Sequence, residues 1–177
     1  MLKTDLETFY GAIRDVPDFP KEGIVFKDIT PLLMQPKLLD GVVEWMASEF
    51  AGANVEKIIA IESRGFLFGA PLALRLGAGL VLARKAGKLP WTRHRVEYAL
   101  EYGTDVIEVH TDSIDEGERV LVVDDVLATG GTAQATGQVV AETGGELVGM
   151  VFLMELAFLN GRQRLDGIDV RAMLSYD

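Results

Sequence analysis

Two adjacent carboxylates, Asp124 and Asp125, stand between an apolar run and a glycine-containing loop. The run, Val120–Val123, is rich in β-branched residues and does not alternate with polar ones, which is typical of a short strand buried on both faces. We expect this strand to end at the two acids. Ligands of open α/β sheets bind at the carboxyl ends of strands. The acid pair is therefore predicted to bind a polyhydroxylated ligand or a metal ion, although solvated acids after a core strand would explain the pair alone.

The loop that follows, Leu127–Thr132, has the composition of an anion site. Small residues let the backbone approach a ligand closely. Ala133–Glu142 reads as a helix, and amides at a helix N-terminus point at an anion that the helix dipole favours. Thr129 and Thr132 add hydroxyl donors. The loop is therefore predicted to hold a phosphate, but not as a Walker A loop, because no G-x-x-x-x-G-K-[ST] occurs in the chain.

A second anion site is indicated by cations that gather in one segment of an acidic chain. The net charge of −10 argues against non-specific binding to nucleic acid, yet Arg84–Arg95 contains no acid. Arg84, Lys85 and Lys88 follow an expected strand and surround a glycine, which favours a focused anion site over a solvated loop. Glu62–Gly65 lies between a strand and a helix, where amides and Arg64 can meet an anion, although a helix cap explains that segment alone.

The length and composition of the chain limit the kinds of protein that it can be. At 177 residues, one domain over 1–177 is expected. The absence of cysteine excludes disulfides and thiolate chemistry. The N-terminal segment carries acids and lacks the apolar core of a signal peptide, which predicts a cytoplasmic protein. The two histidines, His94 and His110, do not have the spacing of shared metal ligands, so no protein-bound zinc or iron is predicted.

Strand-like and helical segments alternate, which predicts an α/β fold with a mainly parallel central sheet flanked by helices. Strands are expected at residues 24–26, 57–61, 79–83, 105–110, 120–123, 146–156 and 170–174, and helices at 2–16, 38–50, 66–76 and 133–142. Residues 161–165 read as a turn or short helix. Residues 84–103, with Gly87 and Pro90, read as a long excursion that is a mobile loop or a hairpin.

The string VLVVDDVLATGGT at 120–132 resembles the phosphoribosyl-diphosphate (PRPP) binding motif of the type I phosphoribosyltransferases. ESRGFLFGAPLAL, ARKAGKLP and YALEYGTD stand in the order and spacing of the adenine-specific members of that family, from about residue 19 to the C-terminus. The resemblance implies the type I phosphoribosyltransferase fold, with an N-terminal helix and small hood over about 1–35 and a flexible catalytic loop over 84–103. It further implies a homodimer that transfers the 5-phosphoribosyl group from PRPP to adenine, with Mg²⁺, giving AMP and pyrophosphate.

The resemblance also implies roles for individual residues. Asp124 and Asp125 would contact the ribose hydroxyls, and Ala128, Thr129, Gly130, Gly131 and Thr132 would wrap the 5′-phosphate. Pyrophosphate would be bound by Glu62, Ser63, Arg64, Arg84, Lys85 and Lys88. Mg²⁺ would be held mainly by PRPP, pyrophosphate and water.

Base recognition and catalysis are assigned by the same resemblance. Val25 would address adenine through its backbone and Phe26 would stack on the ring, with an ordinary core aromatic as the alternative for Phe26. Glu101 would act as acid/base partner of the purine nitrogens with Tyr102 beside it, and Arg64 would assist catalysis.

Two other functions stay open at this point. The first keeps the chemistry but changes the base to xanthine, guanine or hypoxanthine, because backbone recognition leaves little trace in side chains. The second is a PRPP-sensing regulator that binds nucleic acid or a partner, which the acidic charge and the intact YALEYG segment oppose. The cations Arg93 and Arg95, with His94 between them, match no family pattern and receive no role.

Overall fold

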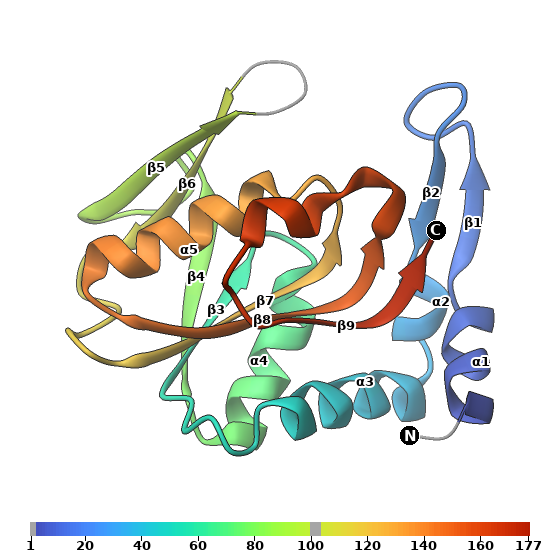
Figure 1. Cartoon of the computed structure of the whole chain (residues 1–177), viewed down its shortest axis with the longest axis horizontal. Helices are drawn as coiled ribbons and strands as arrows, with labels where there is room; N and C mark the ends of the chain where they lie inside the picture. Colours follow the sequence, from blue (N-terminus) through green and yellow to red (C-terminus); the bar gives the residue numbers. More distant parts are fainter. Residues whose placement is uncertain (1–2, 100–103) are drawn as a thin grey trace. The chain divides into compact units, whose positions relative to one another are not determined.

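The computed structural model describes residues 3–99 and 104–177 (Figure 1). The chain divides into two compact units, Met1–Val43 and Glu44–Asp177, and helix α3 (Pro36–Glu49) runs across the boundary. The single domain expected from the sequence stays a prediction.

The first unit begins with α1 (Lys3–Gly11), followed by β1 (Arg14–Pro17), β2 (Val25–Asp28) and α2 (Thr30–Leu33). The expected helix over 2–16 is therefore too long. It ends at Gly11 because Arg14–Pro17 pairs with β2 as an antiparallel hairpin, and this tertiary pairing overrides the helical periodicity of the last residues. The hairpin turn is fixed by Gly23, whose N–H donates to the Asp18 carboxylate at 2.8 Å.

The second unit is built on a seven-stranded sheet in the order β5-β6-β4-β3-β7-β8-β9. Its strands are β3 (Lys57–Ile61), β4 (Gly79–Lys85), β5 (Arg93–Ala99), β6 (Thr104–His110), β7 (Arg119–Leu127), β8 (Glu146–Leu156) and β9 (Val170–Tyr176). The pairs among β4, β3, β7, β8 and β9 are parallel, whereas β6 pairs antiparallel with both β4 and β5. The mainly parallel α/β fold is confirmed, and the described part of segment 84–103 follows the hairpin alternative.

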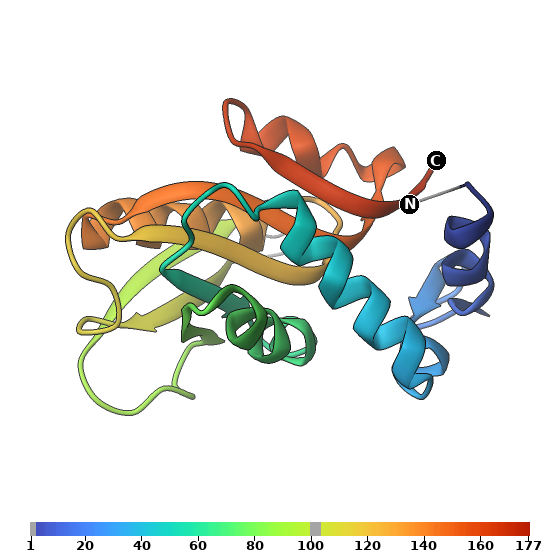
Figure 2. The same ribbon diagram turned by 90° about the horizontal axis from the view of Figure 1, so that it is seen from below.

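Helices cover both faces of this sheet. α4 (Gly65–Leu76) lies on one face, and α5 (Gly131–Thr143) lies on the other together with the 3₁₀ turns η1 (Ala157–Leu159) and η2 (Gly161–Leu165) (Figure 2). Burial on both faces explains why the runs in β3, β7 and β8 are continuously apolar rather than alternating. Gly69 lets α4 approach the sheet, since a Cβ there would stand 2.5 Å from the Ala60 Cβ.

The order of the strands changes direction next to β3. The chain passes from β3 to β4 on one side, and β7 lies on the other side of β3 with β8 and β9 beyond it (Figure 1). At such a switch point, ligands bind outside the carboxyl ends of the strands. The loops after β3 and β7 meet there, and they are the segments singled out by the sequence.

Candidate active site

The acid pair lies inside β7 rather than after it. β7 continues to Leu127 because it pairs with β8 as far as Glu155, so the expected end of the strand at the acids is wrong. Asp125 is almost fully buried, and its Oδ2 lies 2.7 Å from Nε of Arg64. A Cβ at Gly65 would stand 3.0 Å from Oδ1 of Asp124. Gly65 and Arg64 thus bring the loop after β3 directly against the two carboxylates.

The Asp124 carboxyl group lies where its ionised form is disfavoured. Burial, followed by repulsion from the Asp125 carboxylate, raises the pKa of Asp124 well above its ordinary value. The Asp125 N–H donates to Oδ1 of Asp124 at 2.8 Å and only partly offsets this effect. Two adjacent acids held in this way are poised to accept hydrogen bonds from a ligand's hydroxyl groups, which would stabilise the ionised pair.

Asp124→Asn is therefore expected to stabilise the free protein while weakening PRPP binding. A raised carboxyl pKa means that stability present at low pH is lost as the pH rises through the folded-state pKa. The variant should melt about 2–4 °C above the wild type at pH 8, and the difference should shrink toward pH 4. Thermal unfolding across this range measures the effect. A variant that is less stable than the wild type at pH 8 would contradict the assigned electrostatics.

The loop after β7 encloses a cavity of about 160 Å³ at the N-terminus of α5. It is lined by Asp124, by Phe152 and by every residue from Val126 to Ala133. Gly130 precedes α5 with φ of 81°, a left-handed conformation that favours glycine. The predicted phosphate loop thus forms a concave site at the start of a helix of 13 residues, where amides and dipole favour an anion.

A residue that the sequence analysis missed shapes this loop from behind. Gly161, the first residue of η2, packs so closely that a Cβ on it would stand 2.1 Å from the carbonyl oxygen of Ala128. A Cβ on Gly130 would likewise stand 2.4 Å from the carbonyl oxygen of Gly161. The loop therefore rests on a backbone-to-backbone contact that only glycine permits. No sequence signal revealed it, because the partners are about 30 residues apart.

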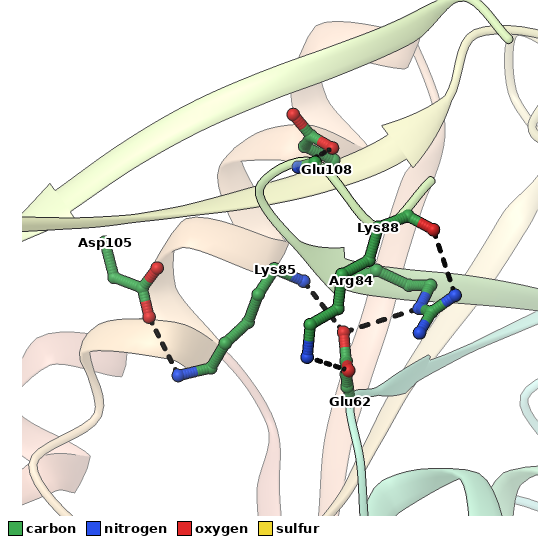
Figure 3. Close-up of polar contacts among 7 residues, drawn as sticks. Glu62, Arg84, Lys85, Lys88, Asp105 and Glu108 are labelled. Atoms are coloured by element: carbon green, nitrogen blue, oxygen red, sulfur yellow. Dashed lines mark hydrogen bonds and ion pairs between the residues drawn. The ribbon is translucent and has the colours of Figure 1, made fainter. Parts of the chain in front are cut away.

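Apart from Arg64, which pairs with Asp125, the charged residues predicted to bind pyrophosphate cluster around Glu62 (Figure 3). Its carboxylate accepts from Nζ of Lys88 at 2.6 Å, from the N–H of Lys85 at 3.0 Å and from Nε of Arg84 at 3.4 Å. Burial opposes ionisation of Glu62, but the hydrogen bonds from Lys88, Lys85 and Arg84 prevail and lower its pKa. Of the cations predicted from the sequence, Arg84 and Lys88 thus reach the loop after β3 through their side chains, whereas Lys85 reaches it through its backbone N–H. The peptide bond between Glu62 and Ser63, which precedes Arg64, is cis.

A chain of polar contacts joins this cluster to the phosphate loop. Nζ of Lys85 lies 2.9 Å from the Asp105 carboxylate, and the Tyr98 hydroxyl donates to Asp105 at 3.3 Å. The Thr132 hydroxyl donates to Tyr98 at 3.1 Å. The contact with Lys85 lowers the pKa of Asp105, and burial raises that of Tyr98. Tyr98 and Asp105 face each other across the β5–β6 ladder, a pairing that the sequence alone did not reveal.

The structure does not test four of the predicted site residues. Glu101 and Tyr102 fall outside the described residues. Val25 and Phe26 belong to the first unit, where Val25 is exposed and Phe26 meets Phe19 edge-to-face at 5.3 Å between ring centroids. Their roles stay predictions.

Over residues 3–99 and 104–177, no group of three or more histidine and acidic side chains is arranged to hold a metal ion. Within the same residues, the structure contains no helix with the length and apolar character needed to cross a membrane.

Comparison with known proteins agrees with this geometry. The sequence profile of the family described as "Phosphoribosyl transferase domain" matches residues 28–171. The adenine phosphoribosyltransferase of Anaeromyxobacter dehalogenans strain 2CP-C is 56% identical over 171 residues, which is 97% of this chain and 99% of that protein. The crystal structure of the Rhodothermus marinus adenine phosphoribosyltransferase has a TM-score of 0.95 and 51% identity, covering 99% of this chain and 100% of that one.

A more distant relative has been crystallised with ligands. The Saccharomyces cerevisiae adenine phosphoribosyltransferase, complexed with an imino-altritol bisphosphate and adenine, has a TM-score of 0.91 and 38% identity, covering 98% of this chain and 100% of that one. The profile spans most of the chain, and the relatives align along nearly their whole length. The chain belongs to the phosphoribosyltransferase family.

Proposed function

We propose that this protein transfers the 5-phosphoribosyl group of PRPP to adenine, giving AMP and pyrophosphate. The observation that carries the proposal is the meeting of three groups at one edge of the sheet: the Asp124–Asp125 pair, the cavity at 128–132 and the cations around Glu62. They match the three parts of PRPP, which are a hydroxylated ribose, a 5′-phosphate and a diphosphate. The adenine phosphoribosyltransferases that align along the full chain support adenine as the acceptor.

The reaction needs charge stabilisation at two places. Displacement of pyrophosphate from the anomeric carbon builds positive charge on the ribose and negative charge on the leaving group. The cations Arg84, Lys85 and Lys88 can offset the negative charge. The carboxylates at 124 and 125 can fix the ribose through its hydroxyl groups. Glu101, placed by its motif near the purine, would exchange a proton with a ring nitrogen as the new bond to N9 forms.

The donor set suits Mg²⁺ only in combination with substrate. Carboxylate oxygens are ligands that Mg²⁺ accepts, and it commonly binds through one or two carboxylates together with substrate phosphates and waters. Asp124 and Asp125 supply such oxygens beside the phosphate loop. We therefore propose that Mg²⁺ arrives with the diphosphate of PRPP, where it would neutralise charge on the leaving group.

Incubation of the purified protein with PRPP, Mg²⁺ and adenine tests the proposal. AMP and pyrophosphate should appear in equal amounts, and a chelator should stop their formation. Tight binding of PRPP without any AMP would instead favour the sensor alternative and would overturn the proposed transfer.

Phe26 provides a prediction about base recognition. If its ring stacks on the purine, Phe26→Ala should raise the KM for adenine by about tenfold, since an aromatic contact is worth roughly 1 kcal/mol or more. The KM for PRPP should change little. Steady-state kinetics with each substrate varied in turn separates the two constants. Phe19→Leu is the matched control, because it removes the aromatic ring packed against Phe26. An unchanged adenine KM in Phe26→Ala would return Phe26 to a structural role.

A homodimer is proposed on the resemblance and on one surface of the second unit. Leu67 and Leu74 of α4 and Leu80 and Leu82 of β4 are large, exposed apolar side chains. Leu80 lies against α4, because its Cδ1 stands 3.4 Å from the position of a Cβ on Gly69. Exposed apolar surface of this kind is typical of a protein–protein contact. The cytoplasmic location expected from the sequence stays a prediction.

A further inference from the structure

We infer that Glu108 is a positioning residue that holds Lys88 in place through two neighbouring residues, and that Arg93 and Arg95 serve Glu108 rather than the substrate. The inference rests on the proposed function, because it assigns Lys88 to the diphosphate of PRPP. It gives a role to Arg93 and Arg95, which lie between the KLP and YALEYG motifs and received no role from the sequence.

Glu108 is an unusual residue because it is a carboxylate buried on a strand of the seven-stranded sheet. It lies on β6 between Ile107 and Val109, and it is fully buried. A buried carboxylate is costly unless charges or hydrogen bonds compensate it. Glu108 stands opposite Arg84 in the β4–β6 ladder, but its carboxylate contacts Arg93, Arg95 and the Gly87 N–H rather than Glu62 or the acid pair. The groups that compensate its buried charge must therefore come from its own neighbours.

Two arginines supply the compensating charge. Nε of Arg93 and Nε of Arg95 lie 2.9 Å and 3.1 Å from Oε1 of Glu108. Among the described residues, Oε1 nevertheless has no hydrogen bond of good geometry, so these contacts act through charge rather than alignment. Arg95 stands directly opposite Glu108 in the β5–β6 ladder. Arg93 and Arg95 thus both pair with Glu108, an acid of the same β5–β6 hairpin.

The other oxygen of Glu108 reaches the turn that carries Lys88 (Figure 3). Oε2 accepts from the N–H of Gly87 at 3.0 Å, and Gly87 adopts a left-handed φ of 78°. On the far side of Lys88, the Arg93 guanidinium donates to the carbonyl oxygen of Leu89 at 3.2 Å. The residues before and after Lys88 are therefore held by one ion-paired unit.

This arrangement aims the side chain of Lys88. Its neighbours Gly87 and Leu89 are fixed from β6 and β5, and its Nζ reaches Glu62 at 2.6 Å on the loop after β3. The carbonyl of Lys88 also accepts from Arg84 at 3.0 Å. A cation held in place before the substrate arrives loses less entropy on binding. Loosening the turn should therefore weaken the binding of a diphosphate and leave the site of adenine unaffected.

Two substitutions at Glu108 separate charge from hydrogen bonding. Glu108→Gln keeps an acceptor for the Gly87 N–H but removes the charge that the arginines neutralise, and Glu108→Leu removes both. We expect the KM for PRPP and the Kd for inorganic pyrophosphate to rise about threefold in the first and about tenfold in the second. The KM for adenine should stay within twofold. Glu97→Gln on the exposed side of β5 is the matched control and should change none of these constants.

A double-mutant cycle tests the role of the arginines. Arg95→Gln should raise the Kd for pyrophosphate in the wild type and have no further effect in the Glu108→Gln background. An equal loss in both backgrounds would mean that Arg95 contacts the ligand itself and would overturn the inference. So would Glu108 variants that melt like the wild type and bind pyrophosphate with unchanged affinity. Pyrophosphate binding is measured by calorimetry without turnover, so failure of the proposed transfer to adenine would be seen separately, as absence of AMP from the wild type.

Discussion

Gly161→Ala is expected to reduce the affinity for PRPP and for AMP by at least about tenfold, although Gly161 itself is not expected to touch either. The reason is the contact behind the phosphate loop, where a Cβ would stand 2.1 Å from the carbonyl oxygen of Ala128. The obstacle is backbone, so a change of rotamer cannot relieve it, and the loop must move. A shift of about 1 Å in a site built on backbone amides is enough to misplace its donors.

The control for this substitution is Gly52→Ala. Gly52 has no atom within 4 Å of an added Cβ, and like Gly161 it does not adopt a positive φ, so alanine there adds the same methyl group without a clash. Calorimetric titration with AMP gives the affinity, and thermal unfolding shows whether each variant is folded. Normal AMP affinity in a folded Gly161→Ala would mean that the loop tolerates the methyl group and that η2 does not support it.

Glu101→Gln is expected to lower kcat by about 10²–10³ while leaving the Kd for PRPP within twofold. A positioned acid/base group contributes an effect of this size, and glutamine keeps the shape of the side chain without the proton transfer. The residue lies outside those that the structure describes, and its role is a prediction from the YALEYG motif. The described residues nearest to it, Ala99 and Thr104, end β5 and begin β6, and the Tyr98 hydroxyl of β5 accepts a hydrogen bond from Thr132 of the phosphate loop.

Glu97→Gln again serves as the comparison, because it removes one negative charge from the same hairpin at an exposed position. Single-turnover kinetics with saturating PRPP isolates the chemical step from product release. If Glu101→Gln turned over at the wild-type rate, another group would have to move the proton. If it lost PRPP affinity instead of rate, Glu101 would belong to the binding site.

The sequence predicted the parts of the site that depend on local patterns. The acid pair, the small-residue loop and the helix after it are contiguous, and each has a physical signature that is readable without tertiary structure. The continuous apolar runs also predicted which strands would be buried on both faces. The limits of elements were less accurate. The helix at the N-terminus ends early because β1 pairs with β2, and β7 extends past the acids because it pairs with β8.

The supporting residues could not be predicted, because their roles depend on partners distant in the sequence. Gly161 resembles any turn glycine until it is placed against Ala128. Glu108 resembles the polar position of a half-exposed strand, whereas β6 is covered there and the acid is buried. Arg93 and Arg95 looked like surplus cations in an anion site, yet they neutralise Glu108. Sequence patterns and motifs thus identify candidate ligand-binding residues. The residues that hold these candidates in place are identified only by packing in the folded structure.

The most direct test of the account is pyrophosphate release from PRPP and Mg²⁺ with adenine, guanine, hypoxanthine and xanthine offered separately. We expect release with adenine and a rate at least about 100-fold lower with each oxopurine, because the 6-oxo group of these bases presents an acceptor where adenine presents a donor. Faster release with an oxopurine would contradict the proposed specificity while leaving the PRPP site in place. No release with any of the four bases would contradict the proposed function itself.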